Sequence, residues 1–192
     1  MLTAISGGIG SGKTIVSRII RSMGFHVYDC DSQAARIMDT DENIKHRIAD
    51  EIGSECLKSD GSIDRMCISQ IVFADQCALQ RLNTIVHGAV RQDLLQWYEK
   101  RSARHCFVET AILYQSGIDR MVDDVWSVVA PKELRITRVM TRNNFDREQV
   151  LARISSQDKY TPKCAHSHVY SITNDCRRPL LPQIERLLKE YI

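Results

Sequence analysis

Short continuous runs of hydrophobic residues alternate along this chain with longer segments whose hydrophobic residues recur at helical spacing. The short runs predict five strands, at residues 3–6, 26–28, 106–109, 125–129 and 169–172. The periodic segments predict helices at residues 15–23, 32–38, 42–52, 65–73, 77–102, 132–142, 148–156 and 179–191. Continuous apolar runs are typical of strands that are buried on both faces of a sheet. Because strands and helices alternate, the pattern predicts an α/β fold with a five-stranded parallel sheet flanked by helices.

Two segments are longer or more polar than a simple crossover between strands requires. Residues 29–105 separate the second strand from the third, and we expect a helical substrate-binding insertion at about residues 60–105. An arginine-rich segment follows the fourth strand, and we expect a lid at about residues 138–166. The alternative for these arginines is a solvated helix face, and it stays open. The whole chain, residues 1–192, is expected to form a single domain with these two additions.

A glycine-rich segment joins the first predicted strand to the first predicted helix. It reads GGIGSGKT over residues 7–14 and matches the pattern G-x-x-x-x-G-K-[ST] at every position. Glycines let such a loop bring backbone N–H groups against phosphate oxygens, and the start of the helix adds a partial positive charge. We expect Lys13 to reach the β- and γ-phosphates of a nucleotide and Thr14 to bind Mg²⁺. The pattern therefore predicts a phosphate-binding loop, whereas a dinucleotide-binding loop would read G-x-G-x-x-G.

The amino-acid composition is typical of a soluble protein and gives no sign of membrane or nucleic-acid binding. Hydrophobic residues make up 43% of the chain and charged residues 26%, which is ordinary for a soluble globular protein. A net charge of +2 gives no reason to expect binding to nucleic acid or to a membrane. No apolar stretch has the length of a membrane span, and we expect no secretory signal. The seven cysteines are scattered without a C-x-x-C pair, which favours reduced thiols and a cytoplasmic location.

Two aspartates follow the second predicted strand, at the edge where a parallel sheet binds its ligands. These residues, Asp29 and Asp31, come shortly after the phosphate-binding loop in the chain. In a phosphate-binding protein, an aspartate at this place can orient Mg²⁺ or accept a proton from a substrate hydroxyl. An Asp-x-Asp pair can also begin a helix, so a capping role is the alternative for both residues.

Taken in order, the motifs of this chain resemble those of the dephospho-coenzyme A kinase family. Residues 5–14 read ISGGIGSGKT, close to the family's L-T-G-G-I-G-S-G-K-[ST]. Asp29-Cys30-Asp31 with Ala35-Arg36 is similar to D-A-D-x-x-A-R, and residues 60–65 read DGSIDR, similar to D-G-x-[IL]-[DN]-R. Residues 82–91 read LNTIVHGAVR and resemble L-x-x-I-x-H-P-x-[VI]-R. Matches of this kind extend from the N-terminus to about the last twenty residues.

The resemblance implies a P-loop kinase that transfers the γ-phosphoryl group of ATP to the ribose 3′-hydroxyl of dephospho-coenzyme A, with Mg²⁺ as cofactor. Its implied catalytic residues are Asp31 as general base, Lys13 and Arg142. The residues expected to bind ATP are Gly8, Ile9, Gly10, Ser11, Gly12, Lys13, Thr14, Ile15, Arg142 and Asn174. Those expected to bind the acceptor are Ser6, Asp31, Arg36, Arg65, His87 and Arg91. Glu109 is a candidate to organise the magnesium site without contacting the ion, the alternative being an N-cap or a surface residue.

The chain departs from the family pattern at several positions. Ser6 stands in place of a threonine, and Gly88 in place of a proline, which predicts a looser helix start there. Ala111 and Gln115 stand where a proline and a carboxylate are common, and Cys176 stands in place of a glycine. None of these positions belongs to the implied catalytic residues, so the catalytic interpretation is kept.

Other functions compete with this interpretation. A P-loop kinase acting on a nucleoside, a nucleotide or a sugar acid would share the loop and the sheet. A GTPase-type switch is disfavoured because the chain lacks an N-K-x-D motif, and an ATPase acting on nucleic acid is disfavoured by the low net charge. The expected partners are ATP and dephospho-coenzyme A, without nucleic acid or membrane, and the expected oligomeric state is a monomer or a weak homo-oligomer.

Overall fold

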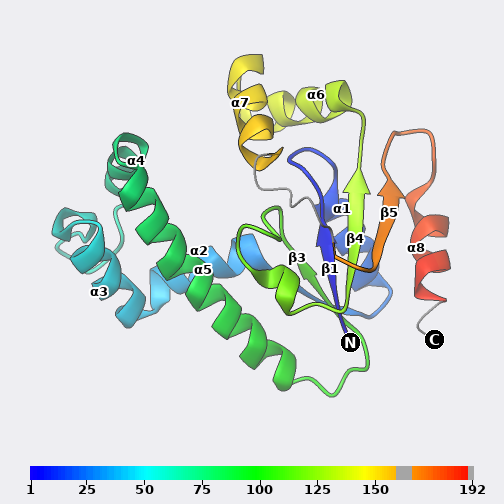
Figure 1. The fold of residues 1–192 in the computed structure, drawn as a ribbon, viewed down its shortest axis with the longest axis horizontal. Helices are drawn as coiled ribbons and strands as arrows, with labels where there is room; N and C mark the ends of the chain where they lie inside the picture. Colours follow the sequence, from blue (N-terminus) through cyan, green and yellow to red (C-terminus); the bar gives the residue numbers. More distant parts are fainter. Residues whose placement is uncertain (159–165, 190–192) are drawn as a thin grey trace. The chain divides into compact units, whose positions relative to one another are not determined.

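The computed structural model describes residues 1–158 and 166–189 of the chain (Figure 1). Its contacts divide the chain into two compact units. The first, called here the sheet unit, comprises Met1–Tyr28 and Ala103–Ile192, and the second, called the helical unit, comprises Asp29–Ser102. The end of the predicted lid, residues 159–165, lies outside the described residues.

The sheet has its strands in the order β2-β3-β1-β4-β5 (Figure 1). Their bounds are Leu2–Ser6 (β1), His26–Asp29 (β2), Cys106–Glu109 (β3), Asp124–Val129 (β4) and Val169–Thr173 (β5). β1 lies between β3 and β4, with both pairs parallel, and β4 pairs in parallel with β5. The predicted parallel sheet is confirmed, and each predicted strand matches an observed one to within one residue at either end. The phosphate-binding loop follows the central strand.

Four α-helices belong to the described part of the sheet unit, and an apolar core packs two of them on the sheet. They are α1 (Lys13–Ser22), α6 (Lys132–Asn143), α7 (Arg147–Asp158) and α8 (Leu180–Leu188), with a short 3₁₀ helix η2 at Ile118–Arg120. The core joins buried residues of α1 and α8 to β1, β3, β4 and β5, and includes Ile5, Val16, Ile20, Phe107, Trp126, Val128, Ile172, Ile184, Leu187 and Leu188. Burial of these side chains fixes α1, and with it the loop that precedes α1, against the sheet.

A second, smaller core holds α6 and α7 together. Its buried residues are Ile136 and Val139 of α6 with Val150 and Ile154 of α7. Ile9 of the glycine-rich loop packs against this cluster. Figure 1 shows both helices at the end of the sheet where the loop between β1 and α1 lies. The arginine-rich segment is therefore packed on the phosphate-binding loop through apolar contacts.

The helical unit contains α2 (Cys30–Thr40), α3 (Glu42–Glu51), the 3₁₀ helix η1 (Ser54–Cys56), α4 (Arg65–Ala74) and α5 (Gln76–Glu99). Each of the four α-helices begins after an aspartate whose side chain accepts hydrogen bonds from the first turn, namely Asp29, Asp41, Asp64 and Asp75. The looser helix start expected at Gly88 is wrong, because α5 runs through that position. Glycine keeps the backbone N–H that proline lacks, so the helix can continue there.

The helices that the structure describes offer no candidate for a membrane crossing, since none of them is both long and apolar enough.

Candidate active site

The glycine-rich loop forms a tight turn between β1 and α1. Gly10 and Gly12 have φ angles of 77° and 98°, in the left-handed region that favours glycine. Ser11 N donates to Gly8 O at 3.1 Å, which closes the turn. A methyl group at Gly12 would overlap the side-chain amide of Asn174. Glycine at Gly10 and Gly12 therefore suits the backbone conformation of the loop, and at Gly12 it also leaves room for the side chain of Asn174.

Lys13 is the first residue of α1, and its side chain turns back over the loop. Its Nζ donates to Gly7 O at 2.9 Å and to Gly8 O at 3.4 Å. The N-terminus of α1, which directly follows the loop, contributes further backbone N–H groups. The fold therefore places a cation directly over the residues expected to bind phosphate.

Thr14 and Glu109 meet beside the loop. Thr14 Oγ1 donates to Glu109 Oε1 at 2.8 Å. Glu109 ends β3 and is only 7% exposed, so the structure places it in the interior rather than at the surface. Its second oxygen, Oε2, is buried and has no hydrogen-bond partner among the described residues. A buried carboxylate oxygen without a partner has the capacity to accept a further donor.

Asn174 and Arg138 close the other side of the loop. Asn174, which follows β5, donates from Nδ2 to Ser11 O at 2.8 Å. Arg138 of α6 donates from Nη2 to Asn174 Oδ1 at 3.2 Å and from Nη1 to Gly10 O at 3.3 Å. These bonds tie α6 and the end of β5 to the carbonyl groups of the loop. Arg138 contacts the loop although it is not among the site residues expected from the sequence.

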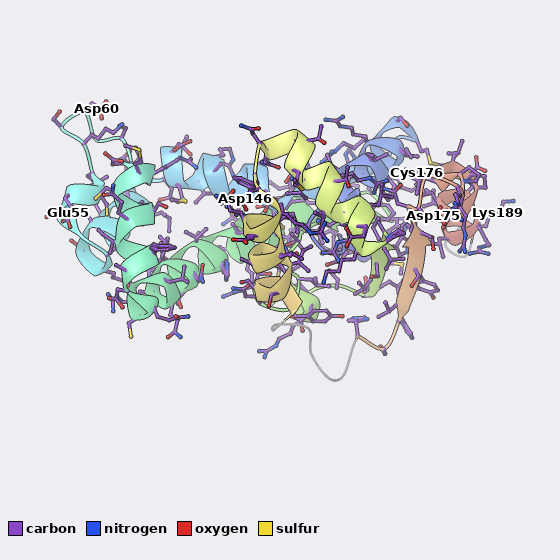
Figure 2. All side chains as sticks on the ribbon, turned by 90° about the horizontal axis from the view of Figure 1, so that it is seen from above. Glu55, Asp60, Asp146, Asp175, Cys176 and Lys189 are labelled. Atoms are coloured by element: carbon purple, nitrogen blue, oxygen red, sulfur yellow. The ribbon has the colours of Figure 1, made fainter. Side chains whose placement is uncertain are left out.

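Asp175 and Cys176, labelled in Figure 2, belong to the turn after β5, and Cys176 stands at the position where the related family has glycine. Cys176 has a φ angle of 63°, in the left-handed region, at a cost that glycine would not incur. Asp175 accepts from the backbone N–H groups of Arg178 and Arg177, both at 2.9 Å, and these bonds lower the pKa of its carboxyl group. Arg138 Nη2 also lies 3.1 Å from Cys176 Sγ. The substitution by cysteine therefore leaves the turn folded beside the loop.

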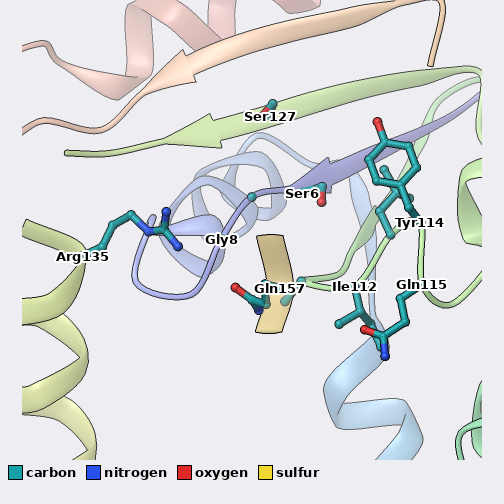
Figure 3. Close-up of a pocket in the computed structure, with 11 residues that line it drawn as sticks. Ser6, Gly8, Ile112, Tyr114, Gln115, Ser127, Arg135 and Gln157 are labelled. Atoms are coloured by element: carbon teal, nitrogen blue, oxygen red, sulfur yellow. The ribbon is translucent and has the colours of Figure 1, made fainter. Parts of the chain in front are cut away.

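A pocket of about 200 Å³ opens beside the first half of the loop (Figure 3). Its lining residues are Ser6, Gly7, Gly8, Ala111, Ile112, Leu113, Tyr114, Gln115, Ser127, Arg135 and Gln157. Two of these residues bind the backbone of Ile9 in the loop. The N–H of Ile9 donates to Gln157 Oε1 at 2.8 Å, and the carbonyl of Ile9 accepts from Arg135 Nε at 2.9 Å. Both α6 and α7 thus hold the loop by its backbone. Figure 3 shows Arg135 reaching from α6 toward Gly8.

Arg142, the predicted lid cation, is not one of the residues that line this pocket. It is exposed in the last turn of α6, and its Nε donates to Asn143 Oδ1 at 2.9 Å. Arg147 at the start of α7 pairs with Glu133 at 2.8 Å. The structure brings Arg135 and Arg138 to the loop instead. Each of them precedes a buried residue of α6, Ile136 or Val139, but the sequence does not show that this face of α6 packs on the loop.

The predicted base, Asp31, lies in the helical unit. It is an exposed residue in the first turn of α2, where its backbone N–H donates to Asp29 Oδ1 at 3.1 Å. The capping alternative holds for Asp29, whose carboxylate also accepts from Ser32 N at 3.2 Å. The side chain that caps α2 is therefore that of Asp29 and not that of Asp31.

The other acceptor-binding candidates of the helical unit are cationic or weakly basic. Arg36 pairs with Asp93 at 2.6 Å, and Arg65 pairs with Asp39 at 2.8 Å. His87 lies on α5, and burial followed by the positive charge of Arg91 lowers its pKa. The lowered pKa favours the neutral form of the His87 side chain. The ion pairs are exposed and contribute little to stability, so both arginines can exchange partners.

Comparison with known proteins gives whole-length matches. The family model described as dephospho-CoA kinase matches residues 1–178. A dephospho-CoA kinase of Dehalococcoides mccartyi is 34% identical over 195 residues, covering 100% of this chain and 98% of that protein. One from Bacteroides fragilis is 35% identical over 185 residues, covering 96% of this chain and 89% of that protein.

Solved structures share the fold. TT1252 from Thermus thermophilus matches with a TM-score of 0.79 at 31% identity, over 100% of this chain and 95% of that chain. A dephospho-CoA kinase from Campylobacter jejuni matches with a TM-score of 0.66 at 24% identity, over 99% of this chain and 96% of that chain.

Proposed function

The chain belongs to the dephospho-CoA kinase family, and we propose that it transfers the γ-phosphoryl group of ATP to the ribose 3′-hydroxyl of dephospho-coenzyme A. The products are coenzyme A and ADP. The observation that carries the proposal is the folded phosphate-binding loop, with Lys13 over Gly7 and Gly8, in a chain that matches the family along residues 1–178. Phosphoryl transfer needs mainly positioning and charge stabilisation, and the loop with its helix supplies both.

Thr14 and Glu109 fit a magnesium ion that arrives with the nucleotide. Hard cations take oxygen ligands, and Mg²⁺ keeps several waters when it binds. We assign the Thr14 hydroxyl as a direct ligand and the buried Glu109 carboxylate, with its unpartnered Oε2, as an acceptor for hydrogen bonds from metal-bound water. When bound, Mg²⁺ neutralises charge on the phosphates. The chain's own contribution is to hold these oxygens in place.

Replacing Glu109 with glutamine tests this assignment. The substitution keeps the size of the side chain and removes its negative charge, so we expect the Mg²⁺ concentration for half-maximal activity to rise about 10–100-fold. Turnover at saturating Mg²⁺ should recover substantially. The measurement is initial rate against Mg²⁺ at fixed ATP, with Glu185→Gln on the exposed face of α8 as the matched control. An unchanged Mg²⁺ requirement would exclude Glu109 from the metal site.

We assign the general base to Asp31, which would accept the proton of the ribose hydroxyl. Asp31 lies in the first turn of α2, and a base in general acid–base catalysis accepts the proton of the group that attacks. Arg36, Arg65 and Arg91 would supply positive charge for the phosphate groups of the acceptor, and His87, whose pKa is lowered by burial and by Arg91, would supply a hydrogen bond. Arg142 remains a candidate for the transferring phosphoryl group, and Ser6 lines the pocket beside the loop.

The setting we propose is the cytoplasm. The seven cysteines are scattered along the chain without a C-x-x-C pair, as expected of a protein kept in a reducing compartment.

An acceptor panel tests the proposed function. The purified protein is incubated with ATP and Mg²⁺ and with one acceptor at a time: dephospho-coenzyme A, adenosine, AMP or a sugar acid. We expect ADP release with dephospho-coenzyme A and only background release with the others. Turnover of another acceptor, with none of dephospho-coenzyme A, would instead identify a different small-molecule kinase on the same fold.

A further inference from the structure

Arg135 carries a hydrogen-bond donor that nothing in the described structure satisfies. It lies in the first turn of α6, where its Nε donates to Ile9 O at 2.9 Å. Its Nη2 is buried and has no hydrogen-bond partner among the described residues. The group packs directly on the phosphate-binding loop, because a methyl group at Gly8 would overlap Nη2. A guanidinium stays charged at any physiological pH.

The pocket around this guanidinium lacks a counter-charge. Among the described residues that line the pocket, Arg135 alone is charged. Gln115, at a position where the related family commonly has a carboxylate, is one of the neutral residues in the lining. A buried charged donor without an acceptor is costly. An anion that enters the pocket could accept a hydrogen bond from Nη2 and so offset the desolvation free energy of this group. The pocket is therefore suited to bind an anion.

The position of Arg135 on the loop indicates which anion this is. Lys13 Nζ contacts Gly7 O and Gly8 O, so both cations meet at the Gly7–Gly8 end of the loop. The lysine of such a loop serves the β- and γ-phosphates, while the backbone N–H groups nearer the helix cradle the inner ones. The cations thus converge where the terminal phosphate of ATP would lie.

The other arginines of α6 are differently engaged. The guanidinium of Arg138 donates hydrogen bonds to the carbonyls of Gly10 and Ser11 and to the side chain of Asn174. Arg142 is exposed and bonds to Asn143. We propose that Arg135 binds the terminal phosphate of ATP from above Gly8 and positions it for transfer. This inference rests on the proposed kinase function and adds a residue that discriminates ATP from ADP.

Replacement of Arg135 by glutamine should weaken binding only where a γ-phosphate is present. We expect the affinity for a non-hydrolysable ATP analogue to fall about 10–100-fold, as for a lost charge-assisted hydrogen bond, while the affinity for ADP stays close to that of the wild type. Arg135→Lys should restore part of the loss, because it keeps the charge. Calorimetric titration of both nucleotides with Mg²⁺ measures these affinities. Arg186→Gln, at an exposed position of α8 outside the loop, is the control for the same substitution elsewhere in the chain.

The outcomes separate this role from a structural one. A purely structural Arg135, acting only through its bond to Ile9 O, would weaken ADP and the ATP analogue equally, and that result would overturn the proposal. Unchanged affinity for both nucleotides would overturn it as well. Retained ADP binding by Arg135→Gln shows that the loop is folded. Because the titrations use no acceptor, they stand whether or not dephospho-coenzyme A proves to be the substrate.

Discussion

Replacing Lys13 with alanine is expected to lower kcat/KM for ATP by about three orders of magnitude, because a cation that stabilises charge on the transferring phosphoryl group is lost. Lys13 lies with its ammonium over Gly7 and Gly8, so the loss should also weaken nucleotide binding. Both kcat and the KM for ATP should therefore change. Steady-state kinetics with varied ATP, and titration of ADP as an independent measure of affinity, provide the test.

Lys132→Ala is the matched control for this variant. Lys132 is an exposed lysine at the start of α6, outside the loop, and its removal should leave both kinetic constants near those of the wild type. Thermal unfolding of Lys13→Ala separates a kinetic defect from a folding defect, since two hydrogen bonds to the loop are lost with the side chain. Normal activity of a folded Lys13→Ala protein would contradict the assignment of the loop.

Replacing Asp31 with asparagine should lower kcat by about two to four orders of magnitude and leave ATP binding nearly intact, which is typical of the loss of a general base. Asparagine keeps the shape of the side chain but cannot accept the proton of the acceptor hydroxyl. The start of α2 should stay folded, because Asp29 rather than Asp31 provides the capping carboxylate.

The measurement is single-turnover phosphoryl transfer beside equilibrium binding of ATP. Asp50→Asn, an exposed position on α3 in the same helical unit, is the control and should behave as the wild type. A turnover of Asp31→Asn equal to that of Asp50→Asn would remove Asp31 from the role of base.

Local patterns along the chain were sufficient to predict much of the sheet and of the loop. The apolar runs at residues 3–6 and 106–109 correspond to strands that are buried on both faces, so their composition reflects their place in the sheet. The loop could be predicted because its glycines are required by backbone geometry, with φ angles of 77° at Gly10 and 98° at Gly12. Such requirements act over a few neighbouring residues and leave a signature in the sequence.

The contacts of Arg135 and Arg138 could not be predicted in this way. The arginines of α6 look alike in the sequence, and which of them faces the loop depends on how the apolar cluster of Ile136 and Val139 docks α6 against Ile9. The same holds for the bond between Thr14 and Glu109, which joins residues far apart in the chain. Partners of this kind are set by tertiary packing, for which a single sequence carries no local signal.

The position of the new phosphate on the product tests the central claim most directly. Dephospho-coenzyme A is converted by the purified protein with ATP and Mg²⁺, and the product is examined by phosphorus–proton correlation NMR. The account predicts one new phosphate coupled to the proton on the ribose 3′ carbon, with ADP formed in equal amount. A phosphate attached elsewhere on the product, or ADP formed without a phosphorylated acceptor, would contradict it.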